Sequence, residues 1–138
     1  MGWLATPARI RIPERVRGAF LCVSVLAFIV TELGRHVYRP YVRANAIHDL
    51  GLADSIGNLG GIVVQIFLTL AVMNPTRKQS YRLAAFLSVG YIVYEFVQPI
   101  LPRGTFDWKD VIGTLMGFCI STLILLVIWQ RFPDAGRE

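Results

Sequence analysis

The sequence has few of the residues that soluble catalytic and binding domains depend on. Charged side chains make up only 17% of its 138 residues, whereas 54% are hydrophobic and the mean hydropathy is +0.53. A chain this apolar is not typical of a soluble domain of its size. The composition therefore directs attention to a membrane setting.

Cysteine and the usual catalytic patterns are also scarce. The two cysteines, Cys22 and Cys119, both lie in apolar stretches, where cysteine is usually a small packing residue. No metal-ligand spacing, nucleotide-binding loop or convincing pair of nucleophile and base occurs in the sequence. We therefore predict no metal site, no cofactor and no catalytic residue.

Positive charge exceeds negative charge, but no long basic run is present. The net charge is +5 and the isoelectric point is about 9.7. Much of the basic charge flanks apolar stretches, where it sets orientation and meets anionic lipid. We therefore expect membrane lipids as partners and no nucleic acid.

Four apolar stretches are each close to the ~20 residues that span a bilayer. They predict an all-α fold, a four-helix transmembrane bundle with helices at about 18–37, 54–73, 82–101 and 110–130. A basic N-terminus (1–17) precedes the membrane domain (18–130), and a short tail (131–138) follows it. Arginines before an apolar run resemble a signal peptide, but no small-x-small cleavage site follows, so we expect a retained helix.

Four spans would put both termini on one side of the membrane. That side would hold nine of the 14 Lys and Arg residues, namely Arg9, Arg11, Arg15, Arg17, Arg77, Lys78, Arg82, Arg131 and Arg137. Positive charge favours the cytoplasmic side. We therefore predict an inner-membrane protein with both termini in the cytoplasm.

A polar motif occurs twice at the start of an apolar helix, once in 54–61 and once in 110–117. Each copy follows a helix that carries an acid near its end, Glu32 in the first half and Glu95 in the second. The pattern predicts two helical hairpins related as a parallel internal repeat. All four carboxylates would then lie toward the outer face, around one polar pocket.

Two interpretations of these motifs stay open. Asp54 and Asp110 either cap their helices or take part directly in function. The small-x-x-x-small spacing indicates close helix packing rather than ligand contact, at Gly57, Gly61, Gly113 and Gly117.

Glu95 needs a partner or a proton. It follows Arg82 by 13 residues, about 20 Å along a helix, which places it inside the hydrocarbon region. Arg103 is the nearest cation in the sequence, and the pair would be structural or would hold the arginine ready for a phosphate. Glu32 has local partners in Arg35 and His36.

The segment from Tyr38 to Ala53 is basic, and Pro40 within it is expected to break a continuous helix. Arg39 and Arg43 lie here at helical spacing. They either snorkel to the interface or form an anion site on the outer face.

The second half resembles the VanZ-like family of small membrane proteins. A motif of that family is similar to the pattern Glu95-x-x-Gln98, then Arg103, a short polar turn, and Asp110 with Gly113 and Gly117. Thr114 stands where the family usually has Asn. In the first half, Ser55 and Asn58 replace the Lys and His that the family often has. The resemblance implies a multi-span membrane protein, and it implies a link with tolerance of glycopeptide antibiotics.

We therefore expect a non-enzymatic membrane protein that binds an envelope component or lipid headgroup, lipid-linked or anionic, in an outer polar pocket. The alternatives are an accessory subunit that docks with other membrane protein subunits and, third, an intramembrane acid/base enzyme using Glu95 and Asp110. The predicted ligand-binding residues are Glu95, Gln98, Arg103, Asp110, Thr114, Asp54, Asn58, Glu32, Arg39 and Arg43.

Overall fold

A computed structural model describes residues 14–102 and 104–132, which form helices and turns without a strand. The helices are α1 (Glu14–Leu33), α2 (Arg39–Ala44), α3 (Leu52–Met73), α4 (Arg77–Val97) and α5 (Trp108–Arg131). A π-helical turn, Gly34–Tyr38, joins α1 to α2, and a 3₁₀ turn, Gln98–Ile100, follows α4. The prediction of an all-α chain is confirmed for the described residues.

Within residues 14–102 and 104–132, four segments are long and apolar enough to cross a membrane, as predicted. They are Glu14–Ala44, Leu52–Met73, Arg77–Ile100 and Trp108–Arg131. Large apolar side chains are exposed along their surfaces, including Leu26, Phe86 and Leu123. Helices that are apolar on their outward faces as well are typical of membrane spans.

The first span continues past the expected break at Pro40. The N–H of Arg39 bonds to the carbonyl of Gly34, five residues earlier, which is the π-helical pattern. Pro40 then falls in the first turn of α2, where the missing N–H of a proline costs little. The prediction that Pro40 breaks the helix is therefore wrong, because the helix changes its hydrogen-bond register just before the proline.

The third span begins at Arg77, five residues before the predicted start at residue 82. Thr76 accepts a hydrogen bond from the Gln79 N–H and donates its own N–H to the Gln79 side chain. This capping box satisfies free backbone groups at the helix end. It starts the helix inside the segment between the second and third predicted helices.

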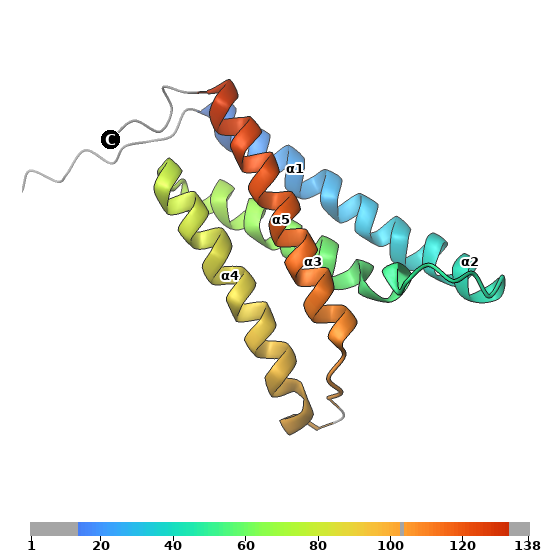
Figure 1. Ribbon diagram of the computed structural model, residues 1–138. Helices are drawn as coiled ribbons and strands as arrows, with labels where there is room; N and C mark the ends of the chain where they lie inside the picture. The colour runs from blue at the N-terminus through green and yellow to red at the C-terminus, as the bar shows by residue number, and fades with distance from the viewer. Residues whose placement is uncertain (1–13, 103, 133–138) are drawn as a thin grey trace, which may run out of the picture.

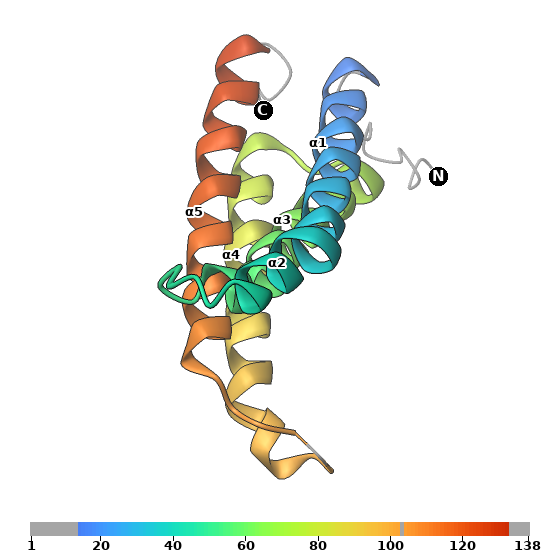
Figure 2. The ribbon, with the colours of Figure 1, turned by 90° about the vertical axis from the view of Figure 1, so that its right-hand side faces the viewer.

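Helix α3 lies at the centre of the molecule (Figure 1). It packs against α1, α4 and α5, and its contacts with α1 and α5 are the most extensive. Helices α4 and α5 also pack together, and they lie side by side in two perpendicular views (Figures 1 and 2). The contact between α3 and α5 therefore joins the pair α1 and α3 to the pair α4 and α5.

Two glycines of α5 permit close contact with the backbone of α3. A Cβ atom at Gly113 would lie 2.7 Å from the carbonyl oxygen of Ser55, and one at Gly117 would overlap the carbonyl of Leu59. Such contact between backbones is what small residues allow in membrane helices.

The other two predicted packing glycines lie in more open surroundings. A Cβ atom at Gly61 would be 3.9 Å from the Tyr91 hydroxyl of α4, an ordinary contact distance. At Gly57 it would meet nothing within 4 Å. The predicted close helix contact is therefore absent at Gly57, because this face of α3 borders a cavity.

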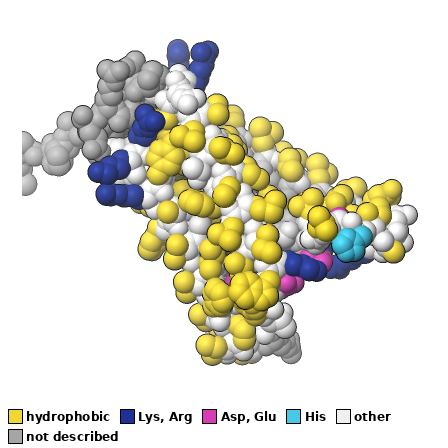
Figure 3. Space-filling view, viewed as in Figure 1, with side chains coloured by type: hydrophobic (Ala, Val, Ile, Leu, Met, Phe, Trp, Pro, Cys, Tyr) yellow, Lys and Arg dark blue, Asp and Glu magenta, His cyan; other side chains and the backbone are white. Residues whose placement is uncertain are grey.

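The apolar core lies toward the end of the molecule where α1 begins and α5 ends. Phe20, Phe67 and Trp129 meet there from three helices, with ring centroids 5.9 Å apart for Phe20–Phe67 and 6.1 Å apart for Phe20–Trp129. All three side chains are buried. Lys and Arg side chains gather at this end (Figure 3). The opposite end carries most of the described ion pairs.

Candidate functional site

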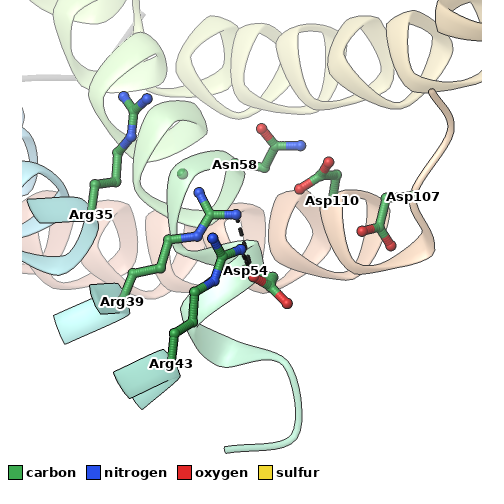
Figure 4. Close-up of a pocket in the computed structure, with 8 residues that line it drawn as sticks. Arg35, Arg39, Arg43, Asp54, Asn58, Asp107 and Asp110 are labelled. Atoms are coloured by element: carbon green, nitrogen blue, oxygen red, sulfur yellow. Dashed lines mark hydrogen bonds and ion pairs between the residues drawn. The ribbon is translucent and has the colours of Figure 1, made fainter. Parts of the chain in front are cut away.

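A polar cavity of about 450 Å³ lies at the end opposite the apolar core (Figure 4). It is formed where the first span ends and where α3 and α5 begin. Its lining residues are Arg35, Arg39, Arg43, Asp54, Gly57, Asn58, Asp107 and Asp110. The volume is within the ~300–1,000 Å³ of small-molecule sites.

One side of this cavity is formed by three arginines, Arg35, Arg39 and Arg43, which we call the arginine wall. They are spaced four apart along the π-helical turn and α2, so they share one side of that continuous helix. Figure 4 shows Arg39 and Arg43 reaching toward Asp54 at the start of α3. The helix that continues through Pro40 therefore places the arginines over the cavity.

Asp54 holds three cations together. Its Oδ1 lies 2.8 Å from Arg43 Nη2 and 3.3 Å from Arg39 Nη2, and its Oδ2 lies 2.8 Å from Lys109 Nζ. Three cations against one carboxylate leave an excess of two positive charges. This side of the cavity is therefore electropositive, although every charge on it has a partner.

Arg35 has its own local partner. Its Nη1 lies 3.2 Å from Glu32 Oε1, and the other oxygen of Glu32 lies 3.1 Å from His36 Nε2. Exposed pairs of this kind contribute at most about 1 kcal/mol to stability. Glu32 is thus occupied on the helix surface and does not line the cavity.

Two other carboxylates cap the helices that open at the cavity. Asp49 accepts hydrogen bonds from the N–H groups of Ala53 at 2.6 Å and Gly51 at 3.1 Å, and Asp107 accepts one from the N–H of Lys109 at 2.9 Å. The bond from Ala53, followed by that from Gly51, lowers the pKa of Asp49 against the opposing effect of desolvation. Capping is therefore supplied by residues before the two motifs.

The side of the cavity opposite the arginines carries Asp107 and Asp110, which we call the acidic wall. Among residues 14–102 and 104–132, neither carboxylate forms an ion pair. Thr114 donates its hydroxyl hydrogen to the backbone carbonyl of Asp110 at 2.9 Å, which leaves that side chain available. In Figure 4 both carboxylates lie apart from the arginines.

Glu95 lies behind the cavity rather than in its lining. Its side chain is only 2% exposed, and Oε1 accepts a hydrogen bond of 2.9 Å from Asn58 Nδ2. Oε2 has no hydrogen-bond partner among the described residues. Asn58 also lines the cavity, so it connects α4 with the site across α3.

No protein-family model, curated protein or solved structure matches this chain.

The structure brings together some of the predicted site residues and excludes others. Asp54, Asn58, Asp110, Arg39 and Arg43 line the cavity, and Glu95 contacts it through Asn58. The predicted residues that do not line it are Glu32, Gln98 and Thr114.

Physical causes account for each exclusion. Glu32 is held by neighbours on its own helix, and Gln98 begins the 3₁₀ turn after α4. Thr114 is fully buried and bonds within α5. Arg103, and with it the predicted pair with Glu95, lies outside the described residues.

Arg35, Asp107 and Lys109 also lie at the site, although they were not predicted as site residues. Asp107 and Lys109 flank Trp108 directly before the second motif, and this charged turn is the signal that marks them. Among the described residues, no group of three or more His, Cys, Asp or Glu side chains is placed to hold a metal ion.

Proposed function

We propose that the protein is a non-enzymatic integral membrane protein that binds a phosphate-bearing lipid headgroup or envelope component in the polar cavity. The observation that carries this proposal is the convergence of Arg39, Arg43 and Lys109 on the single carboxylate of Asp54. Guanidinium groups match phosphate oxygens through paired N–H donors. A phosphate at the arginine wall would offset the excess positive charge there.

The position of the cavity supports a headgroup as ligand. Asp54 and Asp110 belong to the first turns of α3 and α5, and the arginine wall ends the first span. α3 has 22 residues, about 33 Å at 1.5 Å per residue, close to the thickness of a hydrocarbon core. A cavity at the helix ends is therefore near the level of the lipid phosphates.

The proposed setting is the cytoplasmic membrane of a bacterial cell, with the cavity on the outer face and both termini in the cytoplasm. The basic residues at the starts of α1 and α4 and at the end of α5 support this orientation. We further propose that the two hairpins are a parallel repeat, since α3 and α5 both open at the cavity. The motif of the second half supports membership of the VanZ-like family and the associated role in glycopeptide tolerance.

An accessory subunit is the second candidate. A separate apolar groove of about 380 Å³ is formed by α1, α3 and α5, and its lining is mainly aliphatic, including Val30, Leu59 and Ile120. Side chains of another membrane helix can pack into an apolar groove of this kind. In that case the groove, and not the polar cavity, would carry the contacts with partner subunits.

The test is to replace Arg39 and Arg43 together by Gln and to measure phosphatidylglycerol binding to the detergent-solubilised protein by native mass spectrometry. Hydrogen bonds that involve a charge contribute ~1.5–3 kcal/mol, so we expect the affinity to fall at least tenfold. The matched control is the double variant Arg77→Gln and Arg82→Gln, which removes the same charge from the other end of the molecule. Equal lipid binding by the cavity variant and this control, with unchanged melting temperatures, would contradict the proposal.

A further inference from the structure

The distribution of charge around the polar cavity indicates which headgroup it takes. Resting on the proposed function, we infer that the ligand is a zwitterion that joins a phosphate to a primary amine, as phosphoethanolamine does, with the phosphate at the arginine wall and the ammonium at Asp107 and Asp110.

The two sides of the cavity carry opposite excess charge. The cluster around Asp54 has three cations against one carboxylate, whereas Asp107 and Asp110 form no ion pair within the part of the chain that the structure describes. Arg35 is offset by Glu32. A ligand with only a negative charge would offset the positive charge at the arginine wall. It would, however, lie close to the unpaired carboxylates of the acidic wall.

The residues that line the cavity also indicate which kind of cation the acidic wall takes. A primary ammonium group donates N–H hydrogen bonds to carboxylate oxygens. A quaternary ammonium group has no N–H donor and is bound mainly by aromatic faces. None of the eight described lining residues is aromatic. An aromatic cluster of Phe96, Phe106 and Trp108 packs on itself with ring centroids 4.9–6.1 Å apart and is not part of the lining. The lining therefore favours a primary amine over choline.

The acidic wall keeps unused hydrogen-bond acceptors among the described residues. Asp107 caps α5 through Oδ1 alone, which leaves Oδ2 available, and no described side chain donates a hydrogen bond to the carboxylate of Asp110. Both side chains nevertheless lie at the cavity (Figure 4). Two available carboxylates on one side of a cavity are suited to an ammonium group, which has three donors.

The experiment compares three dioleoyl lipids, phosphatidylethanolamine, phosphatidylcholine and phosphatidylglycerol, each titrated into the full-length protein in detergent and followed by native mass spectrometry. We expect phosphatidylethanolamine to bind about tenfold more tightly than phosphatidylcholine, because only its headgroup donates hydrogen bonds to the aspartates. The double variant Asp107→Asn and Asp110→Asn should abolish this preference, and it should strengthen phosphatidylglycerol binding, because two carboxylates no longer repel the phosphate. Asn remains a good helix cap at position 107, so the variant is expected to fold.

The matched control is Glu14→Gln, which removes an acidic charge at the start of α1, remote from the cavity, and should keep the preference. Equal affinities of the wild-type protein for phosphatidylethanolamine and phosphatidylcholine would overturn the inference. In that case, lower affinity of the double variant Arg39→Gln and Arg43→Gln for all three lipids would still support the proposed function. Unchanged affinity of this variant for all three lipids would contradict the proposed function itself.

A last arm separates a lipid from a free metabolite. Soluble glycerophosphoethanolamine is added to the protein after it has been loaded with phosphatidylethanolamine. Displacement only at a large excess of the soluble compound supports a lipid headgroup, because the acyl chains then add to the affinity. Displacement at equimolar concentration overturns the lipid assignment and leaves a site for a soluble amino phosphate.

Discussion

The carboxylates near the cavity have different tasks that depend on their immediate partners. Asp49 and Asp107 accept hydrogen bonds from backbone N–H groups and close the ends of α3 and α5. Asp54 forms ion pairs with three cations, whereas Asp110 forms no ion pair among the described residues. The same kind of side chain thus caps a helix, pairs with cations or stays without an ion pair among the described residues, according to which donors lie within reach.

Only part of this division can be predicted from the sequence. The repeated motif identified Asp54 and Asp110 as special, but capping and function remained equally open because helix ends read from sequence are uncertain by ~2–4 residues. The structure shows a carboxylate before each motif in the capping position. That assignment depends on where the first turn begins, which composition and periodicity do not determine.

Asp49 provides a prediction about pH. Its pKa is lowered in the folded protein, first by the hydrogen bond from Ala53, so the ionised form stabilises the fold at pH values above the unfolded pKa of about 3.9. This contribution is lost as the pH falls below that value and through the lower folded pKa. We expect the melting temperature of Asp49→Asn to change less than that of the wild type between pH 5 and pH 2.

The measurement is thermal unfolding in detergent, followed by circular dichroism at a series of pH values. Asp134→Asn, a change in the C-terminal tail, serves as a control for the loss of one acidic group. Parallel curves for the wild type and Asp49→Asn would show that the hydrogen bonds to Ala53 and Gly51 do not affect stability.

At the level of helices, the contact between α3 and α5 depends on two glycines. The backbone of Leu59 lies where a side chain at Gly117 would begin, and a backbone cannot move aside as a flexible side chain can. The spacing in the sequence predicted small residues at a helix contact, but it gave no information on which helix would be the partner. It also predicted the same role for Gly57, which faces the cavity.

We predict that Gly117→Ala lowers the free energy of unfolding by about 1–3 kcal/mol, since overpacking forces the two helices apart. Gly90→Ala is the matched control, because a Cβ atom at Gly90 in α4 meets nothing within 4 Å. The control should be neutral or stabilising by about 0.5–1 kcal/mol through higher helix propensity. Both free energies of unfolding are to be measured by unfolding in a mixture of detergent and denaturant. Equal stabilities for the two variants would contradict the close contact between α3 and α5.

The first span shows how a local rule fails within a longer element. Proline normally ends a helix because it lacks a donor and crowds the preceding turn. Here the π-helical turn before Pro40 supplies hydrogen bonds over five residues and lets the helix run on to Ala44. Because a π turn has no sequence signature of its own, the extension that positions Arg39 and Arg43 was not predicted.

Across the whole molecule, the two ends have different chemistry. The apolar core joins the helices at the end where α1 begins, and ion pairs and hydrogen bonds join them at the cavity. The repeated motif predicted one polar pocket shared by the two hairpins. It did not predict that Asn58 of α3 would meet Glu95 of α4, because that pairing depends on the arrangement of all the spans.

The asymmetry of the ends leads to a prediction about orientation. The start of α4 is basic and lies at the same end as the start of α1 and the end of α5, whereas the connection between α2 and α3 lies at the cavity end (Figures 1 and 2). If positive charge fixes the basic end in the cytoplasm, the cavity opens on the outer face. Two exposed positions report on this, Asn45 at the cavity end and Lys78 at the basic end.

Single-cysteine variants allow the orientation to be measured. Cys22 and Cys119, which are exposed on the helix surfaces, are first replaced by Ala, and Asn45→Cys or Lys78→Cys is then introduced. A membrane-impermeant thiol reagent should label Asn45→Cys in intact spheroplasts, but Lys78→Cys only after permeabilisation. The reverse pattern would invert the orientation and place the arginine wall against cytoplasmic headgroups. Labelling of both positions in intact spheroplasts would contradict the four-span topology, because the helix between them, α3, would then not cross the bilayer.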